Sequence, residues 1–123
     1  MDESLFDNLI AIYKKPRNKG KMENPSISAK EENTSCGDSV EMFLKIEDGQ
    51  VIDASFEGRG CVISMASADI LTGYIKGKSV DEVEKIDKEE LLNLLGLDLR
   101  NNPIRLKCAL IALSALRKAI STK

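Results

Sequence analysis

Apolar and polar residues repeat along the chain with two different periods, and the change of period separates helical segments from extended ones. Residues 2–14 carry apolar side chains at helical spacing behind an acidic first turn, and a proline follows them. Similar spacing occurs over 62–74, 88–95 and 103–120, and Ser79 has the features of a further helix cap. We therefore expect a short amphipathic helix at the N-terminus and a long helix at the C-terminus, with shorter helices between them.

Between the first two helices the period changes to two, which is typical of strands with one buried face. Ile27 and Ala29 face one way in a short first segment, and residues 39–46 and 51–57 alternate clearly. The Asp48-Gly49 pair between the last two segments is a turn signal that predicts a hairpin. The pattern predicts an α/β fold of the α+β type, in which a small three-stranded antiparallel sheet has helices packed on one side.

Length and composition are those of one ordinary globular domain that spans residues 1–123. Acidic and basic residues are interleaved and give a formal net charge of −2, which argues against a nucleic-acid partner, since that needs clustered Lys and Arg. No run approaches the ~18 consecutive apolar residues of a membrane span, and the N-terminus lacks the layout of a secretory signal. We therefore expect a cytoplasmic protein without membrane contact.

The chain contains no histidine, which removes an entire class of chemistry. Ser-His-Asp and Cys-His catalysis are excluded, and so is an imidazole as metal ligand. Three cysteines remain as the residues most capable of chemistry. They cannot all pair within one chain, and a reducing compartment keeps them as thiols.

The three cysteines lie at the boundaries of the predicted elements. Cys36 and Asp38 flank a glycine at the entry to the second strand, and the glycine lets the backbone bend so that both side chains can meet at one metal. Cys61 lies just past the third strand, where it opens a helix, and Cys108 lies near the start of the last helix. Because the two strand ends are adjacent in a hairpin, we expect Cys36, Asp38 and Cys61 to share one edge of the sheet.

Two simpler interpretations of the cysteines stay open at this point. Each thiol can be a small buried hydrophobic group, which is the commonest fate of a free cysteine. A structural zinc site is the other, although the close C-x-x-C pairs typical of such sites are absent. Single ligands spread along the chain instead favour a site that the fold assembles, for a metal or for thiol chemistry.

Several motifs in the same order resemble the IscU/SufU/NifU N-terminal family of iron–sulfur cluster assembly proteins, over essentially the whole chain. The motifs that carry this resemblance are Tyr13-Lys14-Lys15-Pro16-Arg17-Asn18, Cys36-Gly37-Asp38, Phe56-Glu57-Gly58-Arg59-Gly60-Cys61-Val62-Ile63-Ser64-Met65-Ala66-Ser67, Ile75-Lys76-Gly77-Lys78 and Ile104-Arg105-Leu106-Lys107-Cys108. The resemblance implies the same α/β fold that the pattern predicts.

The resemblance also implies a site and a function. Cys36, Cys61, Cys108 and Asp38 are expected to hold iron as a [2Fe-2S] cluster, on a scaffold protein rather than an enzyme. A cysteine desulfurase is expected to deliver sulfur to Cys108 as a persulfide, and the finished cluster passes to apo iron–sulfur acceptor proteins. Whether the cluster lies within one chain or bridges a homodimer stays open. The basic segment 14–21 is either a solvated connector or part of the desulfurase docking surface.

Departures from the family pattern support a second hypothesis. Scaffold members usually have His before the third cysteine, whereas this chain has Lys107, as the SufU-like branch does. The alternative is therefore a zinc-dependent sulfurtransferase of the SufU type, which binds zinc with the same residues and takes persulfide on Cys36. The extra segment of SufU-like proteins between the second and third cysteines does not fit into residues 78–102.

Lys107 has a consequence for either hypothesis. A protonated lysine cannot ligate a metal. We therefore expect it to tune the site by pairing with Asp38 and offsetting negative charge. Residues 102–107 do not reproduce the Leu-Pro-Pro-Val-Lys motif that scaffold members present to a dedicated Hsp70 chaperone, which argues against recruitment of that chaperone.

Overall fold

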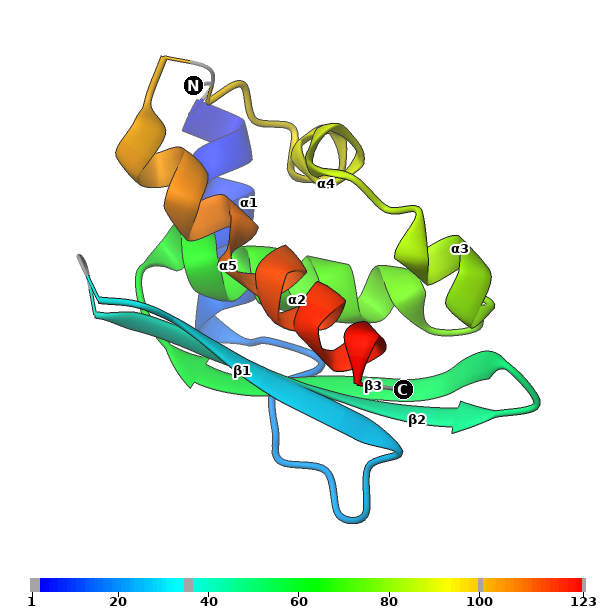
Figure 1. The fold of residues 1–123 in the computed structure, drawn as a ribbon. Helices are drawn as coiled ribbons and strands as arrows, with labels where there is room; N and C mark the ends of the chain where they lie inside the picture. Colours follow the sequence, from blue (N-terminus) through cyan, green and yellow to red (C-terminus); the bar gives the residue numbers. More distant parts are fainter. Residues whose placement is uncertain (1–2, 35–36, 100, 123) are drawn as a thin grey trace.

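The computed structural model describes residues 3–34, 37–99 and 101–122, and Figure 1 shows their arrangement. The elements in chain order are α1 (Glu3–Lys14), β1 (Ile27–Asn33), β2 (Asp38–Glu47), β3 (Gln50–Arg59), α2 (Val62–Ile75), α3 (Val80–Glu84), α4 (Lys88–Leu95) and α5 (Pro103–Ser121). These bounds confirm the elements predicted from the periodicity. None of the described helices is both long and apolar enough to cross a membrane.

The three strands form one antiparallel sheet in the order β1-β2-β3. Asp38, the first residue of β2, pairs with Asn33 at the end of β1. Ser39 pairs with Arg59 at the end of β3. The start of the central strand therefore lies beside the ends of both neighbours, and this edge of the sheet is where the chain leaves β3 for α2.

The helices cover one face of the sheet, as predicted (Figure 1). Helix α5 packs on β1 and β2, and α2 packs mainly on β3. The two helices also pack against each other, while α1 packs on α2 and α4 contacts both α2 and α5. Helix α2 is thus enclosed by the sheet and by other helices.

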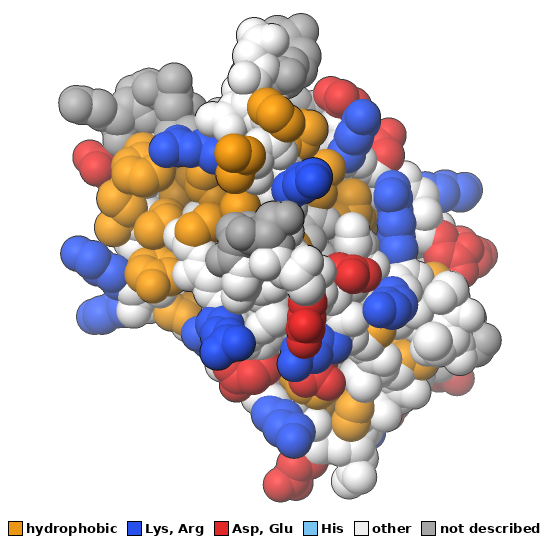
Figure 2. All heavy atoms as spheres, turned by 60° about the vertical axis from the view of Figure 1, so that its left-hand side comes forward, with side chains coloured by type: hydrophobic (Ala, Val, Ile, Leu, Met, Phe, Trp, Pro, Cys, Tyr) orange, Lys and Arg blue, Asp and Glu red, His pale blue; other side chains and the backbone are white. Residues whose placement is uncertain are grey.

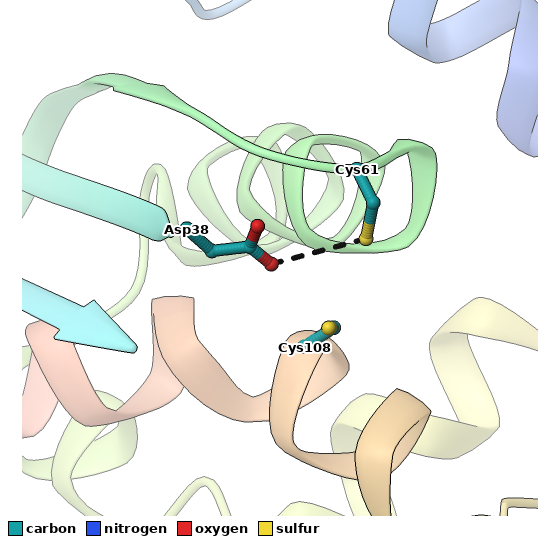
Figure 3. A group of neighbouring side chains, drawn as sticks. All are labelled: Asp38, Cys61 and Cys108. Atoms are coloured by element: carbon teal, nitrogen blue, oxygen red, sulfur yellow. Dashed lines mark hydrogen bonds between the residues drawn. The ribbon is translucent and has the colours of Figure 1, made fainter. Parts of the chain in front are cut away.

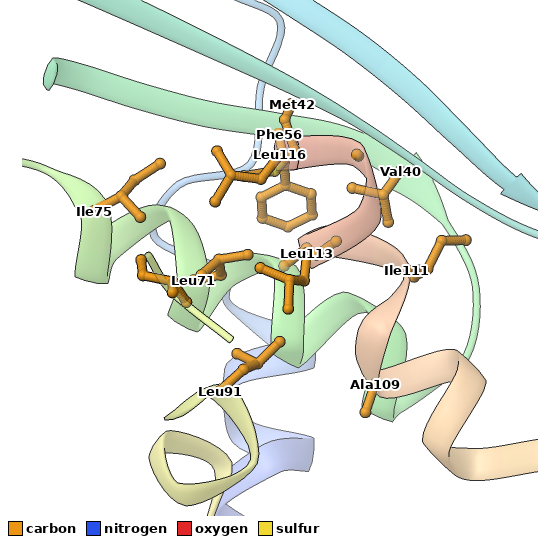
Figure 4. Close-up of a cluster of buried hydrophobic side chains, with 14 of the residues drawn as sticks. Val40, Met42, Phe56, Leu71, Ile75, Leu91, Ala109, Ile111, Leu113 and Leu116 are labelled. Atoms are coloured by element: carbon orange, nitrogen blue, oxygen red, sulfur yellow. The ribbon is translucent and has the colours of Figure 1, made fainter. Parts of the chain in front are cut away.

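The core lies between the sheet and the pair α2 and α5 (Figure 4). Val40, Met42 and Phe56 point from the strands toward Leu71 and Leu113 on the two helices, and all five are at most 2% exposed. The buried cluster is mainly aliphatic, with Phe56 and two Met residues inside it, and Phe43 is also buried at 3% exposed. Removing the side chain of a core leucine costs about 2–5 kcal/mol, so this layer supplies much of the stability.

The hydroxyl groups of α2 are buried along with its apolar residues. Ser64, Ser67 and Thr72 lie opposite its apolar stripe in the sequence pattern, yet each is 0% exposed. The Ser67 hydroxyl donates to the Ala109 carbonyl of α5 at 2.6 Å, and the Thr72 hydroxyl donates to the Ala68 carbonyl at 2.8 Å. The face of α2 that carries these hydroxyls is therefore buried rather than solvated, and hydrogen bonds to backbone carbonyls satisfy the hydroxyls.

The basic segment after α1 is fixed to the domain through Asn18. The Asn18 amide donates to the Asp69 carboxylate at 2.8 Å, and the Phe56 amide of β3 donates to the Asn18 carbonyl at 3.0 Å. The Lys76 ammonium donates to the Asn18 side-chain carbonyl at 2.6 Å. Lys76 follows Cys61 by 15 residues, so this contact lies about 20 Å along α2 from that thiol at 1.5 Å per residue.

Acidic residues of the region 79–90 cap helices and link them. The Ser79 hydroxyl accepts from the Glu82 amide at 3.1 Å, and the Ser79 amide donates to the Glu82 carboxylate at 3.1 Å, which makes a capping box for α3. Asp87 caps α4, and the Tyr74 hydroxyl of α2 donates to the Glu90 carboxylate. Several of these carboxylates therefore have defined roles at the ends of α3 and α4 and in their contact with α2.

The capping box predicts a pH dependence of stability. The hydrogen bond from the Ser79 amide lowers the pKa of Glu82 below its usual value of 4.5. A lowered pKa stabilises the folded state above pH 4.5, and this contribution is lost as the pH falls through the pKa of the folded protein. Glu82→Gln should therefore lie below wild type in urea midpoint at pH 6, with the difference shrinking toward pH 3. A pH-independent difference, or the same trend in the control Glu84→Gln, would contradict this assignment.

Candidate metal centre

Three potential metal ligands converge from three elements at the sheet edge (Figure 3). Asp38 begins β2, Cys61 is the N-cap of α2, and Cys108 lies in the second turn of α5. One ligand atom from each lies within 4.8 Å of the other two. Residues 23 and 47 positions apart in sequence thus meet within the span of a single metal centre.

Strand pairing places the carboxylate of Asp38. Gly37 precedes it with a φ of 75°, a left-handed conformation that favours glycine, and its amide donates to the Asn33 carbonyl at 2.9 Å. The pairing of Asn33 with Asp38 then turns the side chain toward α2, where it is only 4% exposed. A carboxylate so deeply buried needs a compensating partner, such as a hydrogen-bond donor or a metal.

The start of α2 places the thiol of Cys61. Its backbone is extended, with φ of −75° and ψ of 173°, and its sulfur accepts a hydrogen bond from the Ser64 amide at 3.5 Å. The same sulfur lies 3.9 Å from the Asp38 carboxylate and 3.6 Å from the Ser64 hydroxyl oxygen. The cysteine therefore takes the place that Ser, Thr, Asp or Asn usually occupies at a helix cap.

Gly60 makes room for this cluster of side chains. A Cβ atom at this position would lie 2.8 Å from the Asp38 carboxylate carbon and 2.4 Å from the Ser64 hydroxyl oxygen. Both distances are shorter than atoms tolerate without a shift of the neighbour. The glycine is required here by the close approach of the carboxylate to the backbone between β3 and α2.

Cys108 is held against α2 by the hydrogen bond between helices next to it. The Ala109 carbonyl accepts from Ser67, two turns along α2 from Cys61. Cys108 is 5% exposed, whereas Cys61 is exposed to solvent. The group therefore has a buried side, formed by Asp38 and Cys108, and an accessible side at Cys61.

The other two residues that the sequence analysis predicts for the site are Cys36 and Lys107. Cys36 lies outside the described residues. Lys107 is exposed and lines a surface hollow together with Glu31, Glu32 and Leu110. Within the described part of the chain, no ion pair joins Lys107 to Asp38, so the expected pairing is absent from this structure.

The donor set fits a thiophilic metal. Thiolates are soft ligands that suit zinc and iron–sulfur clusters, and a carboxylate oxygen completes such sites as a harder ligand. Asp38, Cys61 and Cys108 thus fit the kind of metal or cluster that the sequence analysis predicts. The sequence analysis missed the roles of Gly60 and Ser64, although a glycine before the cysteine and a serine at its third following position were visible signals.

The surface around the start of α5 is rich in apolar side chains. Figure 2 shows this side of the molecule, where hydrophobic groups gather among Lys and Arg side chains. Ile104, four residues before Cys108, is 71% exposed, and Tyr13 of α1 is 43% exposed. Exposed large apolar residues beside a candidate site are typical of surfaces that contact other proteins.

Comparison with known proteins identifies the relatives of this chain. A family model described as the NifU-like N terminal domain matches residues 5–122. The iron-sulfur cluster assembly scaffold protein IscU of Thermotoga maritima is 38% identical over 116 residues, which cover 83% of this chain and 82% of that protein. The zinc-dependent sulfurtransferase SufU of Bacillus subtilis is 36% identical over 126 residues, which cover 89% of this chain and 84% of that protein.

A solved structure agrees with these relatives. The putative iron-sulfur cluster assembly scaffold protein for the SUF system of Fervidobacterium islandicum superposes with a TM-score of 0.76 and 28% identity. The superposition covers 98% of this chain and 96% of that one. The whole domain, including the elements that bring Asp38, Cys61 and Cys108 together, thus has the architecture of that protein.

The packing at Gly60 predicts how the site responds to one methyl group. In Gly60→Ala the new Cβ should displace the Asp38 carboxylate, and we expect the Zn²⁺ dissociation constant to rise about tenfold or more, as for changes that misorient ligands. Competition with a chromophoric chelator measures the constant. Gly73→Ala is the matched control on α2, because its Cβ meets only the side-chain amide nitrogen (Nδ2) of Asn18, at 3.2 Å. Equal affinities in the two variants would refute the role of Gly60.

Proposed function

The chain belongs to the family of the NifU-like N-terminal domain, and on this basis we propose that it is a scaffold on which a [2Fe-2S] cluster is assembled and from which it is transferred. The observation that most supports the proposal is the convergence of Asp38, Cys61 and Cys108 within 4.8 Å. The cluster is the cargo of such a protein, and the side chains hold it only until an apo-protein accepts it.

The ligand set we propose consists of Cys36, Cys61, Cys108 and Asp38. Three thiolates bind iron strongly, whereas the single carboxylate is a harder and weaker ligand for a cluster. A site with four cysteines would retain the cluster more tightly. The mixed set therefore suits a protein that must both hold and release its cargo.

A cysteine desulfurase supplies the sulfur in this proposal. The Cys108 thiolate attacks the outer sulfur of the desulfurase persulfide, the S–S bond breaks, and the desulfurase cysteine leaves as a thiolate. An external electron donor then supplies two electrons that reduce the transferred sulfur to sulfide. Because Cys108 is only 5% exposed, the desulfurase must displace part of what covers it.

The second candidate is a zinc-dependent sulfurtransferase, and the 36% identity to the protein of that name favours it. In this function Cys36, Cys61, Cys108 and Asp38 would hold Zn²⁺, a metal that binds thiolates and carboxylates. The Cys36 thiolate would attack the outer sulfur of the desulfurase persulfide, and the S–S bond would break so that the desulfurase cysteine leaves as a thiolate. Lys107 stands where scaffold members usually have a histidine, and this difference favours the sulfurtransferase.

The proposed partners are a cysteine desulfurase and apo iron–sulfur proteins. The exposed apolar side chains of Ile104 and Tyr13 are candidates for such contacts. The sequence before Cys108 gives no support for a dedicated Hsp70 chaperone. We expect the assembly to occur in the cytoplasm, where thiols stay reduced.

Reconstitution distinguishes the two candidate functions. Under anaerobic conditions with iron, cysteine and a desulfurase, the wild-type protein should develop the visible absorption of a [2Fe-2S] cluster and transfer it to an apo-ferredoxin. Replacing Cys36, Cys61 or Cys108 singly by Ser should abolish the absorption, because each removes a thiolate ligand. Stoichiometric zinc, no chromophore and zinc-dependent stimulation of the desulfurase would instead establish the sulfurtransferase.

The persulfide acceptor can be identified separately. After treatment with desulfurase and cysteine, mass spectrometry should find an added sulfur of 32 Da on wild type and on Cys36→Ser, but not on Cys108→Ser, because the Cys108 thiolate is the proposed nucleophile. Thermal unfolding of the variants checks that each is folded. Loss of the adduct in Cys36→Ser alone would favour the sulfurtransferase.

A further inference from the structure

The Ser64 side chain makes contacts that neither the core nor the ligand set explains. It is 0% exposed, and its hydroxyl oxygen lies 3.6 Å from the Cys61 sulfur. Its backbone amide donates to the same sulfur at 3.5 Å. We propose that Ser64 is a positioning residue, which holds the Cys61 sulfur with two hydrogen bonds and sets how strongly that sulfur binds the metal or cluster. This inference rests on the proposed function, because it needs Cys61 to be a ligand.

The Ser64 hydroxyl can form a hydrogen bond with the Cys61 sulfur both without and with a bound metal. In the structure it donates to the Cys61 carbonyl at 3.1 Å, while the Cys61 thiol donates to the hydroxyl oxygen. A ligating sulfur has no proton and can only accept. A hydroxyl proton rotates about its C–O bond, so Ser64 can then turn its proton to the sulfur.

This rotation leaves no buried group without a partner. The Cys61 carbonyl also accepts from the Met65 amide at 3.1 Å, which is the first hydrogen bond of the helix. Loss of the Ser64 hydroxyl from that carbonyl therefore leaves it satisfied. The hydroxyl can therefore donate the second hydrogen bond to the Cys61 sulfur without leaving a buried acceptor unsatisfied, so the cost in folding free energy is small.

Packing holds Ser64 in this place and keeps water from substituting for it. Its oxygen occupies the space that a Cβ of Gly60 would enter, at 2.4 Å. The serine and Asp38 thus share the pocket made by the missing side chain of Gly60. Because Ser64 is fully buried, its removal leaves a gap on the inner side of the Cys61 sulfur.

Hydrogen bonds to a ligating sulfur withdraw electron density from it. They stabilise the thiolate, and they are one of the factors that set the reduction potential of an iron–sulfur cluster. Losing a group that orients a ligand typically costs 10–100-fold in metal affinity. We expect the loss of the Ser64 hydroxyl to fall at the lower end of this range, because the backbone amide of residue 64 remains as a donor.

Thr72 provides a matched control on the same helix. It is also 0% exposed, and its hydroxyl also donates to backbone carbonyls, those of Ala68 and Asp69, each at 2.8 Å. No described hydrogen bond joins its hydroxyl to a sulfur, whereas that of Ser64 contacts Cys61. Thr72→Val therefore removes a buried hydroxyl and its hydrogen bonds within α2, but no contact with a proposed ligand or its neighbour.

The experiment compares wild type, Ser64→Ala and Thr72→Val after loading with Co²⁺. Ser64→Ala should bind Co²⁺ about tenfold more weakly, and its sulfur-to-cobalt charge-transfer band should move to longer wavelength, because the sulfur becomes more electron-rich. Thr72→Val should stay within about twofold of wild type with an unmoved band. A purely structural role for Ser64 would lower occupancy without moving the band.

The outcomes separate this inference from the function on which it rests. If wild type binds Co²⁺ with sulfur ligands while Ser64→Ala matches Thr72→Val in affinity and band position, the inference is wrong and the metal site stands. If wild type binds no Co²⁺ through sulfur, both the inference about Ser64 and the proposed metal site are wrong. Should Ser64→Ala not fold, wild type loaded with ¹¹³Cd²⁺ gives the answer. Scalar coupling from the metal to the Ser64 amide or hydroxyl proton supports the inference, and its absence overturns it.

Discussion

The candidate site depends on one close approach, between the Asp38 carboxylate and the backbone at Gly60. Because Asp38 begins the central strand, its side chain meets the chain where β3 turns into α2, and a Cβ at Gly60 would force the Asp38 and Ser64 side chains to shift. This contact fixes the distance from the carboxylate to Cys61, the next residue. The register of the sheet and the start of α2 are thereby linked at a single point, and the metal ligands are a consequence of that link.

Burial of α2 extends the same constraint to the third element. An unpaired hydroxyl in the interior costs about 1–3 kcal/mol, so each buried serine or threonine of this helix needs a specific partner. Ser67 finds its partner on α5, next to Cys108, and Ser64 finds its partners at Cys61. Polar groups inside the helix layer thus fix the positions of the two thiols relative to each other, whereas apolar contacts alone would permit small sliding movements.

The arrangement of exposed and buried ligands suits a protein that carries a cargo. Asp38 and Cys108 form the protected side, and Cys61 faces solvent at a helix N-terminus. Cys61 is therefore the more accessible of the two described thiols for a partner, and the exposed Ile104 lies on α5, four residues before Cys108. A rigid base with an accessible thiol permits exchange of the cargo without unfolding of the domain.

Periodicity and turn signals in the sequence determined the elements, because side-chain burial repeats every two residues in a strand and every 3.6 in a helix. They also determined that Asp38 and Cys61 share a sheet edge, since the Asp48-Gly49 hairpin fixes the register. Only the tertiary structure decided that the hydroxyls of α2 are buried, that Ser64 contacts the Cys61 sulfur, and that Lys107 lines the hollow beside Glu31. These features depend on how helices separated in sequence pack together, and a local pattern of residues does not encode such distances.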